Sequence, residues 1–507
     1  MINNLELAVK EIAKIKNLAD LAGAKRKISK KYKIAVPSNV NLLKAYHNLL
    51  KNKRLKPNKN LEFLLRKRRV RSLSGIVNIS VLTKPYKCPG KCLFCPSQKG
   101  IPKSYLAKEP AVQRAILTGF DPYLQFRTRV EGLEVTGHPT DKIELRIIGG
   151  TWSYYPQKYQ EWFVERCFDA ANNKRSKNLL QAQKLNEKAK NRIIGLTIET
   201  RPDYISSQEI KRLREFGVTR VELGVQSIYD NVLKINKRGH GVQETIKATK
   251  LLKDAGFKVS YQIMPNLPGS TFKKDIQMFK ELFSNPDFQP DLLKIYPLAL
   301  VKEAEIYNLY KNKKYKPYPK DKLIKLLREI KEQIPYYVRI ERVIRDIPSE
   351  DVVEGGVKMS NLREIVQKEA NCRCIRCREV KEDYNPKEKL YLFKQEYGAS
   401  GGREIFLSFE NKNRTKLYAL LRLRIIENLA IVREIHTYGQ MLQITRGPSS
   451  GQAVQHKGLG KKLMKEAEKI AKESGAKKLS VIAGIGARPY YRKLGYKLEN
   501  TYMVKGL

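Results

Sequence analysis

The pattern of hydrophobic and polar residues changes twice along the chain and predicts three parts with different folds. In the middle part, short β-branched segments alternate with amphipathic helical stretches such as 207–216 and 242–255. This alternation implies parallel strands joined by right-handed crossovers, and therefore a complete or partial TIM-like (β/α) barrel. The expected strands are 77–82, 143–148, 193–199, 220–224, 258–264 and 292–297.

Polar or glycine residues end most of these strands. Chemistry in such barrels gathers at the carboxyl ends of the strands, which makes these residues candidates for a site. A buried Glu or Gln at a strand end is often only a structural hydrogen bonder, but several in register favour an active site. The candidates for cofactor binding are Gly149, Gly150, Glu199, Gln226 and Gln262, and those for catalysis are Lys294 and the nearby Tyr296.

The first 75 residues contain twenty Lys or Arg against four Asp or Glu, with apolar spacing typical of amphipathic helices. The whole chain has a formal net charge of +49, which favours a polyanionic partner such as RNA or DNA. We predict a small helical module that contacts phosphates. The alternatives are a solvated basic face and a Lys-rich composition set by genome or habitat. The candidate RNA contacts are Lys51, Lys53, Arg54, Lys56, Arg66, Lys67, Arg68 and Arg69.

After about residue 395, strand-like segments at 404–409, 417–425 and 431–438 precede a loop rich in Gly, Ser and Thr. A helix with one apolar face then begins at a glycine-bearing turn, and a further strand is expected at 479–482. Bare N–H groups and the positive end of the helix dipole suit a pyrophosphate at this turn. Another phosphate ligand is the alternative. The turn consists of Gln455, His456, Lys457, Gly458, Leu459, Gly460 and Lys461.

Three of the seven cysteines, Cys88, Cys92 and Cys95, fall within eight residues with the spacing C-x3-C-x2-C. Three thiolates on one loop can hold three irons of a 4Fe–4S cluster and leave the fourth iron open to a small molecule. Structural zinc is the alternative, although no fourth Cys or His follows closely. A disulfide is not indicated, because neither an even number of cysteines nor an oxidising compartment is suggested.

A second cysteine group, Cys372, Cys374 and Cys377, has the spacing C-x-C-x2-C. Three soft ligands in a short segment suit structural zinc. No fourth ligand is visible locally, and His436 or another of the five histidines is a candidate. Unligated thiols and a second iron–sulfur cluster are the alternatives.

A chain of 507 residues is too long for one core. We expect a basic helical module at 1–75, the barrel at 76–360, a zinc-binding linker at 361–395 and an α/β domain at 396–507. No apolar run is long enough to span a membrane, and the N-terminus has no signal pattern. These features predict a cytoplasmic protein without membrane attachment.

The first cysteine loop resembles the signature of radical S-adenosylmethionine (SAM) enzymes, and the glycine turn with its neighbours is similar to the coenzyme A loop of GNAT acetyltransferases. The pairing of the two resembles the catalytic subunit of the elongator complex and its free-standing archaeal relatives. The segments that carry this resemblance are 71–75, 83–85, 198–203, 222–227, 378–380, 433–439 and 455–460.

The resemblance implies a reaction that uses both halves. The GNAT half would hold acetyl-CoA, and the barrel would hold SAM and the wobble uridine of a tRNA anticodon loop. A 5′-deoxyadenosyl radical would take hydrogen from the acetyl methyl group, and the carbon radical would add to C5 of uridine 34. Thioester hydrolysis would leave 5-carboxymethyluridine. Lys294 and Tyr296 could meet base or acyl oxygen, while Tyr490 and Tyr491 could position the thioester.

Other functions are compatible with parts of the sequence. A protein lysine acetyltransferase would need only the GNAT half, with a structural iron–sulfur domain. An RNA-binding scaffold would leave two intact motifs without a purpose, and a radical methylase or methylthiolase would not need the acyl-CoA half. A requirement for other elongator subunits is not indicated, and the oligomeric state stays open, with a homodimer as one option.

Overall fold

The computed structural model describes residues 4–15, 18–66, 72, 74–359, 361–381, 385, 387–439 and 458–507. Its middle part is a seven-stranded sheet in the order β1 to β7, in which every pair of neighbours is parallel. The two edge strands do not pair, so the sheet is a partial barrel, as predicted. The strands are β1 (Ile76–Leu82), β2 (Lys142–Ile148), β3 (Arg192–Thr200), β4 (Arg220–Gln226), β5 (Lys258–Ile263), β6 (Leu292–Ile295) and β7 (Arg339–Arg342).

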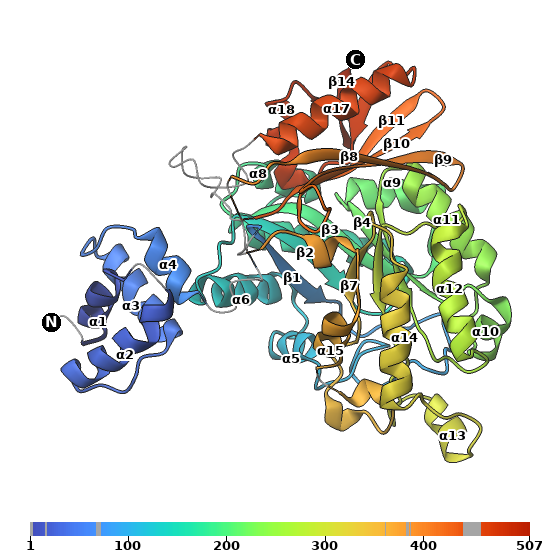
Figure 1. The fold of residues 1–507 in the computed structure, drawn as a ribbon, viewed down its shortest axis with the longest axis horizontal. Coiled ribbons are helices and arrows are strands. Elements are labelled where there is room, and N and C mark those ends of the chain that lie inside the picture. The colour runs from blue at the N-terminus through green and yellow to red at the C-terminus, as the bar shows by residue number, and fades with distance from the viewer. Residues whose placement is uncertain are drawn as a thin grey trace.

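Helices cover the outer face of this half-barrel (Figure 1). Polar caps begin several of them, because a side-chain oxygen satisfies an N–H group of the first turn. Asp121, Ser206 and Thr271 each accept such a bond. The helices are α5 (Pro110–Leu117), α6 (Pro122–Val135), α7 (Gln157–Asn172), α8 (Leu179–Asn186), α9 (Ser207–Glu215), α10 (Asp230–Ile235), α11 (Val242–Asp254), α12 (Phe272–Ser284), α13 (Ile306–Lys311), α14 (Lys320–Glu332), α15 (Leu362–Glu369) and α16 (Ile375–Arg378).

The N-terminal helices form a separate unit with its own apolar core and stand to one side of the molecule (Figure 1). The unit meets the rest at the end of α6, where Arg66 Nε donates to the Gly137 carbonyl at 2.8 Å. Gly137 has φ +80°, a conformation that favours glycine. The helices are α1 (Asn4–Ile12), α2 (Leu18–Tyr32), α3 (Asn39–Lys51) and α4 (Lys59–Leu65).

The C-terminal part is a second seven-stranded sheet in the order β13-β14-β12-β11-β10-β9-β8. Its pairs are antiparallel except β11 and β12, which run parallel. β8 begins at Tyr391, so the boundary predicted at 395/396 falls inside a strand. The elements are β8 (Tyr391–Ala399), β9 (Gly402–Glu410), β10 (Leu417–Ile426), β11 (Leu429–Thr437), α17 (Leu459–Glu473), β12 (Lys478–Val481), α18 (Arg488–Arg492), β13 (Lys497–Glu499) and β14 (Tyr502–Gly506).

Buried charges join the two sheets. Asp291, just before β6, contacts Arg433 of β11 at 2.9 Å and Lys253 of α11 at 3.6 Å. Glu404 of β9 contacts Arg433 at 3.1 Å and Arg424 at 3.0 Å. All five residues are at most 1% exposed. Charges this deeply buried hold a geometry only when each is paired, so the network fixes the second sheet against the half-barrel.

The second sheet packs on the amino-terminal ends of the barrel strands. Arg433 Nη1 donates to the Phe257 carbonyl just before β5, and Arg422 Nη2 donates to the Tyr337 carbonyl just before β7. A Cβ on Gly484 would lie 2.0 Å from the Ile194 carbonyl oxygen, so only glycine allows this close approach. In the part of the chain that the structure describes, no helix combines the length and apolarity that a bilayer crossing requires.

Candidate active site

The loop between β1 and α5 carries the first cysteine group into a large cavity. The cavity has a volume of about 1340 Å³, and Cys88, Cys92 and Cys95 line it. Cys88 Sγ lies 3.9 Å from Thr151 Oγ1, and Arg238 Nη1 lies 3.4 Å from Cys92 Sγ. The three cysteines thus line one cavity at the carboxyl ends of the strands, but their Sγ atoms do not all lie within 4.8 Å of one another.

Two guanidinium groups place positive charge beside these thiols. Arg201 is held by Asp203 at 2.9 and 2.8 Å, while its Nη1 lies 2.5 Å from the position that a Cβ on Gly90 would take. Arg201 Nη1 and Arg238 Nε are buried without a hydrogen-bond partner among the described residues. Buried guanidinium N–H groups without a partner, beside three soft thiols, fit a bound anionic iron–sulfur centre. Arg201 was recognised from the sequence only as part of segment 198–203, and Arg238 was not singled out.

Gly149 and Gly150 form the turn that directly follows β2. Their φ angles are +120° and +55°. A Cβ on Gly149 would lie 2.3 Å from Thr83 Oγ1, which is itself 2.8 Å from the hydroxyl of Tyr155. Glycine is therefore required at position 149, where the backbone packs against Thr83, and Gly150 lines the cavity. Cofactor binding by this turn stays a prediction.

Polar residues at the ends of β3, β5 and β6 meet inside the cavity. Glu199 accepts hydrogen bonds from Tyr105 at 2.9 Å, Gln262 at 3.3 Å and Lys294 at 3.1 Å. Burial opposes the ionisation of Glu199, but Lys294 and these hydrogen bonds lower its pKa to about 2. Burial likewise opposes the charge of Lys294, but Glu222 and Glu199 raise its pKa. Lys294 is thus a cation and a hydrogen-bond donor.

Most of the barrel candidates lie together around the cavity. Charged residues that the sequence did not single out lie there too. Gln226 also lines the cavity and has φ +71°. Deeper in the half-barrel, Glu341 contacts Arg146 and lies 2.9 Å from Arg220, which lies 2.7 Å from Glu144. Charged residues of this kind ordinarily indicate the protein surface. Glu144, Arg146 and Arg220 lay within expected strands, whereas Glu341 lies in β7, which the sequence did not predict.

The predicted pyrophosphate turn lies at the N-terminus of α17. Gly458 has φ +69°, and a Cβ on Gly460 would lie 3.0 Å from the Tyr490 hydroxyl and 3.8 Å from Ile435. Leu459 is buried and Lys461 is exposed. Gln455, His456 and Lys457 lie outside the described residues. The fifteen-residue helix presents free N–H groups and a positive dipole end, which fits the pyrophosphate of coenzyme A.

β11 separates this turn from the cavity. β12 pairs with β11 only at residues 430–432, so residues 433–437 have an open edge. The Gly460 backbone lies close to the side chains of Ile435 and Thr437, and Glu434, Ile435, His436 and Tyr438 line the cavity. The cavity therefore extends from the cluster cysteines, at one end of the half-barrel, to the strand beside the acyl-CoA turn.

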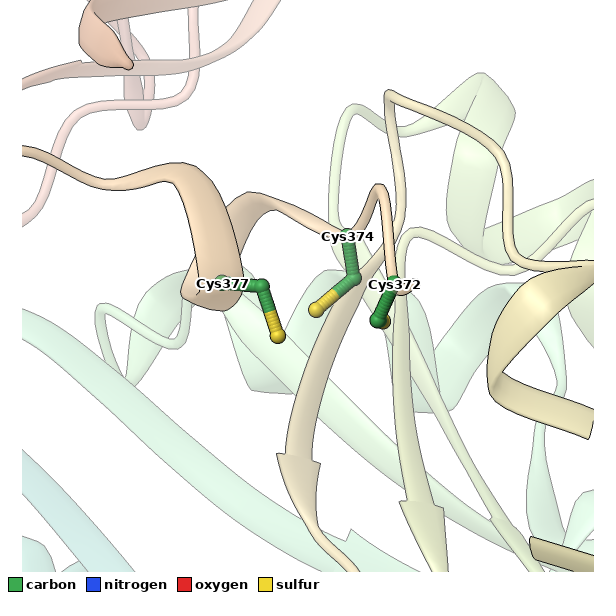
Figure 2. Close-up of side chains that lie close together, drawn as sticks. All are labelled: Cys372, Cys374 and Cys377. Atoms are coloured by element: carbon green, nitrogen blue, oxygen red, sulfur yellow. The ribbon is translucent and has the colours of Figure 1, made fainter. Parts of the chain in front are cut away.

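The second cysteine group forms a compact set of ligands (Figure 2). The Sγ atoms of Cys372, Cys374 and Cys377 lie within 4.8 Å of one another. Tetrahedral zinc with Zn–S bonds of about 2.3 Å needs sulfurs about 3.8 Å apart, so the arrangement fits one zinc ion. No His, Asp, Glu or further Cys of the described residues joins the group, and His436 is not part of it.

The predicted RNA contacts are partly described. Lys51, Lys53, Arg54 and Lys56 are exposed on the N-terminal unit, and Arg54 lies 3.9 Å from Glu6. Arg66 contributes to the junction with α6. Lys67, Arg68 and Arg69 lie outside the described residues.

Comparison with known proteins gives the same two halves. The Radical SAM superfamily matches residues 82–282, the Radical_SAM C-terminal domain residues 290–371 and the acetyltransferase (GNAT) domain residues 451–506. The tRNA uridine(34) acetyltransferase of Methanocaldococcus infernus is 48% identical and covers 94% of this chain and 93% of that protein. The chain belongs to the same family as that protein, since 48% identity extends over almost the whole of both chains.

Members of this family from distant organisms are similar over most of the chain. Human Elongator complex protein 3 is 38% identical, with 87% of this chain and 86% of the human protein covered. The solved structure of Methanocaldococcus infernus Elp3 with an N-terminal deletion superposes with a TM-score of 0.75 at 46% identity. That match covers 86% of this chain and all of the other. As a member of this family, the chain has a radical SAM half and a GNAT acyltransferase half.

Proposed function

We propose that this chain modifies the wobble uridine of tRNA, using acetyl-CoA and SAM to form 5-carboxymethyluridine at position 34. The observation that carries the proposal is the single cavity bordered by the cluster cysteines and by β11 of the GNAT half. Relatives named tRNA uridine(34) acetyltransferase, similar over most of the chain, support the same substrate.

Cys88, Cys92 and Cys95 would hold three irons of a 4Fe–4S cluster, and SAM would lie along Gly149 and Gly150. When bound, the cluster and SAM would supply the radical chemistry that can remove a hydrogen atom from the acetyl methyl group. Arg201 and Arg238 stabilise negative charge on the thiolates. The walls of the half-barrel keep water away from the carbon radical.

Lys294 and Glu199 would orient the uracil. A protonated Lys294 donates to a carbonyl oxygen of the base or of the acyl group, while the Glu199 carboxylate accepts a hydrogen bond. The acetyl carbon radical adds to C5, and loss of the C5 proton and of one electron to a one-electron acceptor restores the ring. A wobble base is unpaired and enters such a pocket at low cost.

His436 is placed to assist thioester cleavage. Burial lowers its pKa to about 4, so the ring is neutral at pH 7, and its Nε2 has no hydrogen-bond partner in the described part of the chain. Nε2 can therefore take a proton from the attacking water. The C–S bond breaks, CoA leaves as the thiol, and the carboxylate stays on the base.

Tyr490 is the better placed of the two predicted tyrosines. Its side chain is 39% exposed and its hydroxyl adjoins Gly460, whereas Tyr491 is 5% exposed and packs against Tyr496. Tyr490 would position the thioester. Tyr491 stays a candidate through its contact with the Tyr490 ring, whose centroid is 5.2 Å away.

The remaining partners follow from surface and ligand chemistry. We infer that the exposed lysines of the N-terminal unit bind tRNA phosphates. We also infer that Cys372, Cys374 and Cys377 hold structural zinc, with a fourth ligand outside their cluster.

An anaerobic assay tests the function. Reconstituted protein, dithionite, SAM, methyl-labelled acetyl-CoA and tRNA would be incubated, and the RNA digested for mass spectrometry. We expect labelled 5-carboxymethyluridine, lost in Cys92→Ser and in tRNA with cytidine at position 34. Formation of 5′-deoxyadenosine and free CoA without a labelled nucleoside would overturn the proposal. Acetylated peptide, unaffected by Cys92→Ser, would instead establish a protein lysine acetyltransferase.

A further inference from the structure

Six aromatic rings follow one another along the surface beside the cluster loop, and we call them the aromatic ladder. Consecutive ring centroids lie 5.6, 5.2, 5.0, 6.1 and 5.8 Å apart. Two of these contacts are stacked and one is edge-to-face, as aromatic pairs prefer. In spatial order the rings are Trp162, Tyr159, Tyr155, Tyr86, Tyr154 and Tyr204.

Three rings of the ladder lie close in sequence to residues that line the cavity. Tyr86 comes two residues before Cys88. Tyr154 ends the short helix η2 (Trp152–Tyr154), directly after the cavity residue Thr151. Tyr204 ends the short helix η3 (Pro202–Tyr204), directly after the cavity residue Arg201. Three loops far apart in sequence thus bring aromatic rings to one edge of the site.

Three rings of the ladder are exposed enough to contact a partner. Tyr86 is 40% exposed, Tyr154 37% and Trp162 43%. Among the described residues, the other large aromatic side chain of comparable exposure is Tyr490, which adjoins the acyl-CoA turn. Exposed aromatic rings of this chain therefore gather at its two half-sites, which singly scattered surface hydrophobics would not do.

The exposed rings rest on a fixed support. Tyr86 stacks on Tyr155, which is 5% exposed and whose hydroxyl donates to the Lys84 carbonyl at 2.8 Å. Tyr155 stacks in turn on Tyr159, whose hydroxyl accepts from the Lys84 N–H at 3.0 Å. A pre-ordered ring loses little conformational entropy when a base stacks on it.

Positive charge accompanies the ladder. Lys84 Nζ lies 4.9 Å above the Tyr159 ring. Lys87 and Lys91, on either side of Cys88, are exposed. Cationic groups beside stacking rings are the combination with which proteins bind single-stranded nucleic acid, since the cations meet phosphates and the rings meet bases.

We propose that the aromatic ladder is a stacking platform for the unpaired bases that flank the reacting base of an RNA loop. This rests on the proposed function and adds how the loop is held. Stacking on a ring tolerates every base, because each has a π-face. The neighbours would stay outside on Tyr86 and Tyr154 while the reacting base enters the cavity beside them.

The test uses an anticodon stem-loop RNA with 2-aminopurine at position 35, next to uridine 34, and the full-length protein. Stacking on a ring should quench the fluorescence of 2-aminopurine when the RNA binds. In Tyr86→Leu and Tyr154→Leu we expect the quenching to be lost and Kd to rise roughly tenfold. Tyr86→Phe keeps an aromatic ring, so this variant should retain both the quenching and the Kd of the unchanged protein.

The matched controls are Tyr307→Leu and Tyr310→Leu on α13. These tyrosines also stack, with centroids 6.2 Å apart and Lys311 5.2 Å above Tyr307, but no residue within two positions of either one lines the cavity. We expect both controls to bind and quench like the unchanged protein. Iron content and the thermal transition of each variant confirm that the fold is intact.

The outcomes separate this proposal from the function. If the unchanged protein forms modified uridine while Tyr86→Leu and Tyr154→Leu bind and quench normally, the platform is wrong and the function stands. If quenching depends on Tyr86 and Tyr154 but no uridine is modified, the platform stands and the function fails. Loss of binding in Tyr86→Phe as well would also overturn stacking as the cause.

Discussion

At the scale of single residues, Gly458 and Gly460 at the start of α17 are required for different reasons. Gly458 has φ +69° but open space around its Cα, whereas Gly460 would bring a Cβ 3.0 Å from the Tyr490 hydroxyl. Alanine at position 458 therefore strains the backbone by roughly 1–2 kcal/mol. Alanine at position 460 instead crowds the proposed acyl-CoA site.

We predict that Gly460→Ala raises the Kd for acetyl-CoA by about tenfold, because overpacking typically costs about 1–3 kcal/mol. Gly458→Ala should mainly lower Tm. Calorimetric titration and thermal unfolding of both variants check this. Adding Tyr490→Phe to Gly460→Ala removes the crowding oxygen and should recover part of the affinity. Equal acetyl-CoA affinities in Gly460→Ala and the unchanged protein would contradict the assignment.

The pKa of Glu434 leads to a prediction about how the stability of the protein depends on pH. Burial opposes its ionisation, but Lys258 and Arg422 lower its pKa from 4.5 to about 2. A lowered pKa means that the stabilisation is complete above pH ~4.5 and is lost as the pH falls toward 2. The full loss is at most about 3 kcal/mol. Glu434→Gln cannot titrate and should lack this part of the acid dependence.

Urea unfolding at several pH values between 6 and 3 measures the effect. The free energy of unfolding of the unchanged protein should fall more steeply below pH 4.5 than that of Glu434→Gln. Parallel pH profiles would show that Glu434 has the same pKa in the folded and unfolded chains. Asp287→Asn removes an exposed carboxylate of the half-barrel, and this control should follow the unchanged protein.

The sequence predicted residues whose type and position both carried information. The cysteines, the paired glycines and the strand-end Glu199 were recognisable, because their chemistry and their spacing agree. Arg146 and Glu341 were not, since the sequence around a charged residue does not reveal that a partner on another strand neutralises it, and the strand of Glu341 was itself not predicted. Pairing between distant residues is a property of the folded chain.

At the scale of elements, the same cause explains which strands were found. β1 to β6 are rich in β-branched residues and end in glycine or polar residues, so their pattern was clear. β7, Arg-Ile-Glu-Arg, has only four residues, and Glu341 points its charge into the barrel network. β8 alternates between half-buried and exposed positions and was taken for part of a linker.

At the scale of elements, the segment that carries Cys372, Cys374 and Cys377 leads to a prediction about zinc content. Next to it, Arg378 donates to the Tyr336 carbonyl at 2.6 Å and contacts Glu410 of β9, while Glu379 lies 2.7 Å from Arg339 of β7. Zinc on these cysteines would therefore brace the contact between the half-barrel and the second sheet. We expect about one zinc per chain, and in Cys374→Ser both zinc loss and a lower Tm.

Elemental analysis of purified protein measures zinc and iron together. Cys374→Ser should lose zinc and keep iron, and Cys92→Ser should show the reverse. Cys167→Ser, a buried cysteine of α7 away from both groups, should keep both metals even if Tm falls. Full zinc content in Cys374→Ser would rule out this site.

At the scale of the whole molecule, the buried network around Asp291 predicts how the protein unfolds. Asp291 of the half-barrel meets Arg433 of the second sheet, and Lys253 of the half-barrel meets Glu404 of the second sheet, so each half neutralises part of the buried charge of the other. Removing one partner of a buried ion pair costs about 3–5 kcal/mol. We expect one calorimetric transition for the unchanged protein and two for Asp291→Ala. A single transition, merely shifted, would show that apolar packing alone couples the halves.

The charge of the N-terminal unit leads to a prediction about tRNA. A net charge of +49 could attract RNA from any side, so affinity alone does not identify the binding face. Each phosphate contact adds about 0.7–0.9 to the slope of log K against log salt. Changing Lys51, Lys53 and Lys56 to Ala should reduce that slope by roughly 2 if these side chains touch phosphates.

The control removes the same charge elsewhere: Lys465, Lys469 and Lys472 to Ala, all exposed on α17. Filter binding of tRNA across a salt series compares the two triple variants. If only the N-terminal variant lowers the slope, this separate helical unit binds the phosphates of the tRNA body. The cavity then receives one base of the same tRNA. If both lower it equally, the diffuse field of the chain binds the RNA, and the unit is a solvated basic face.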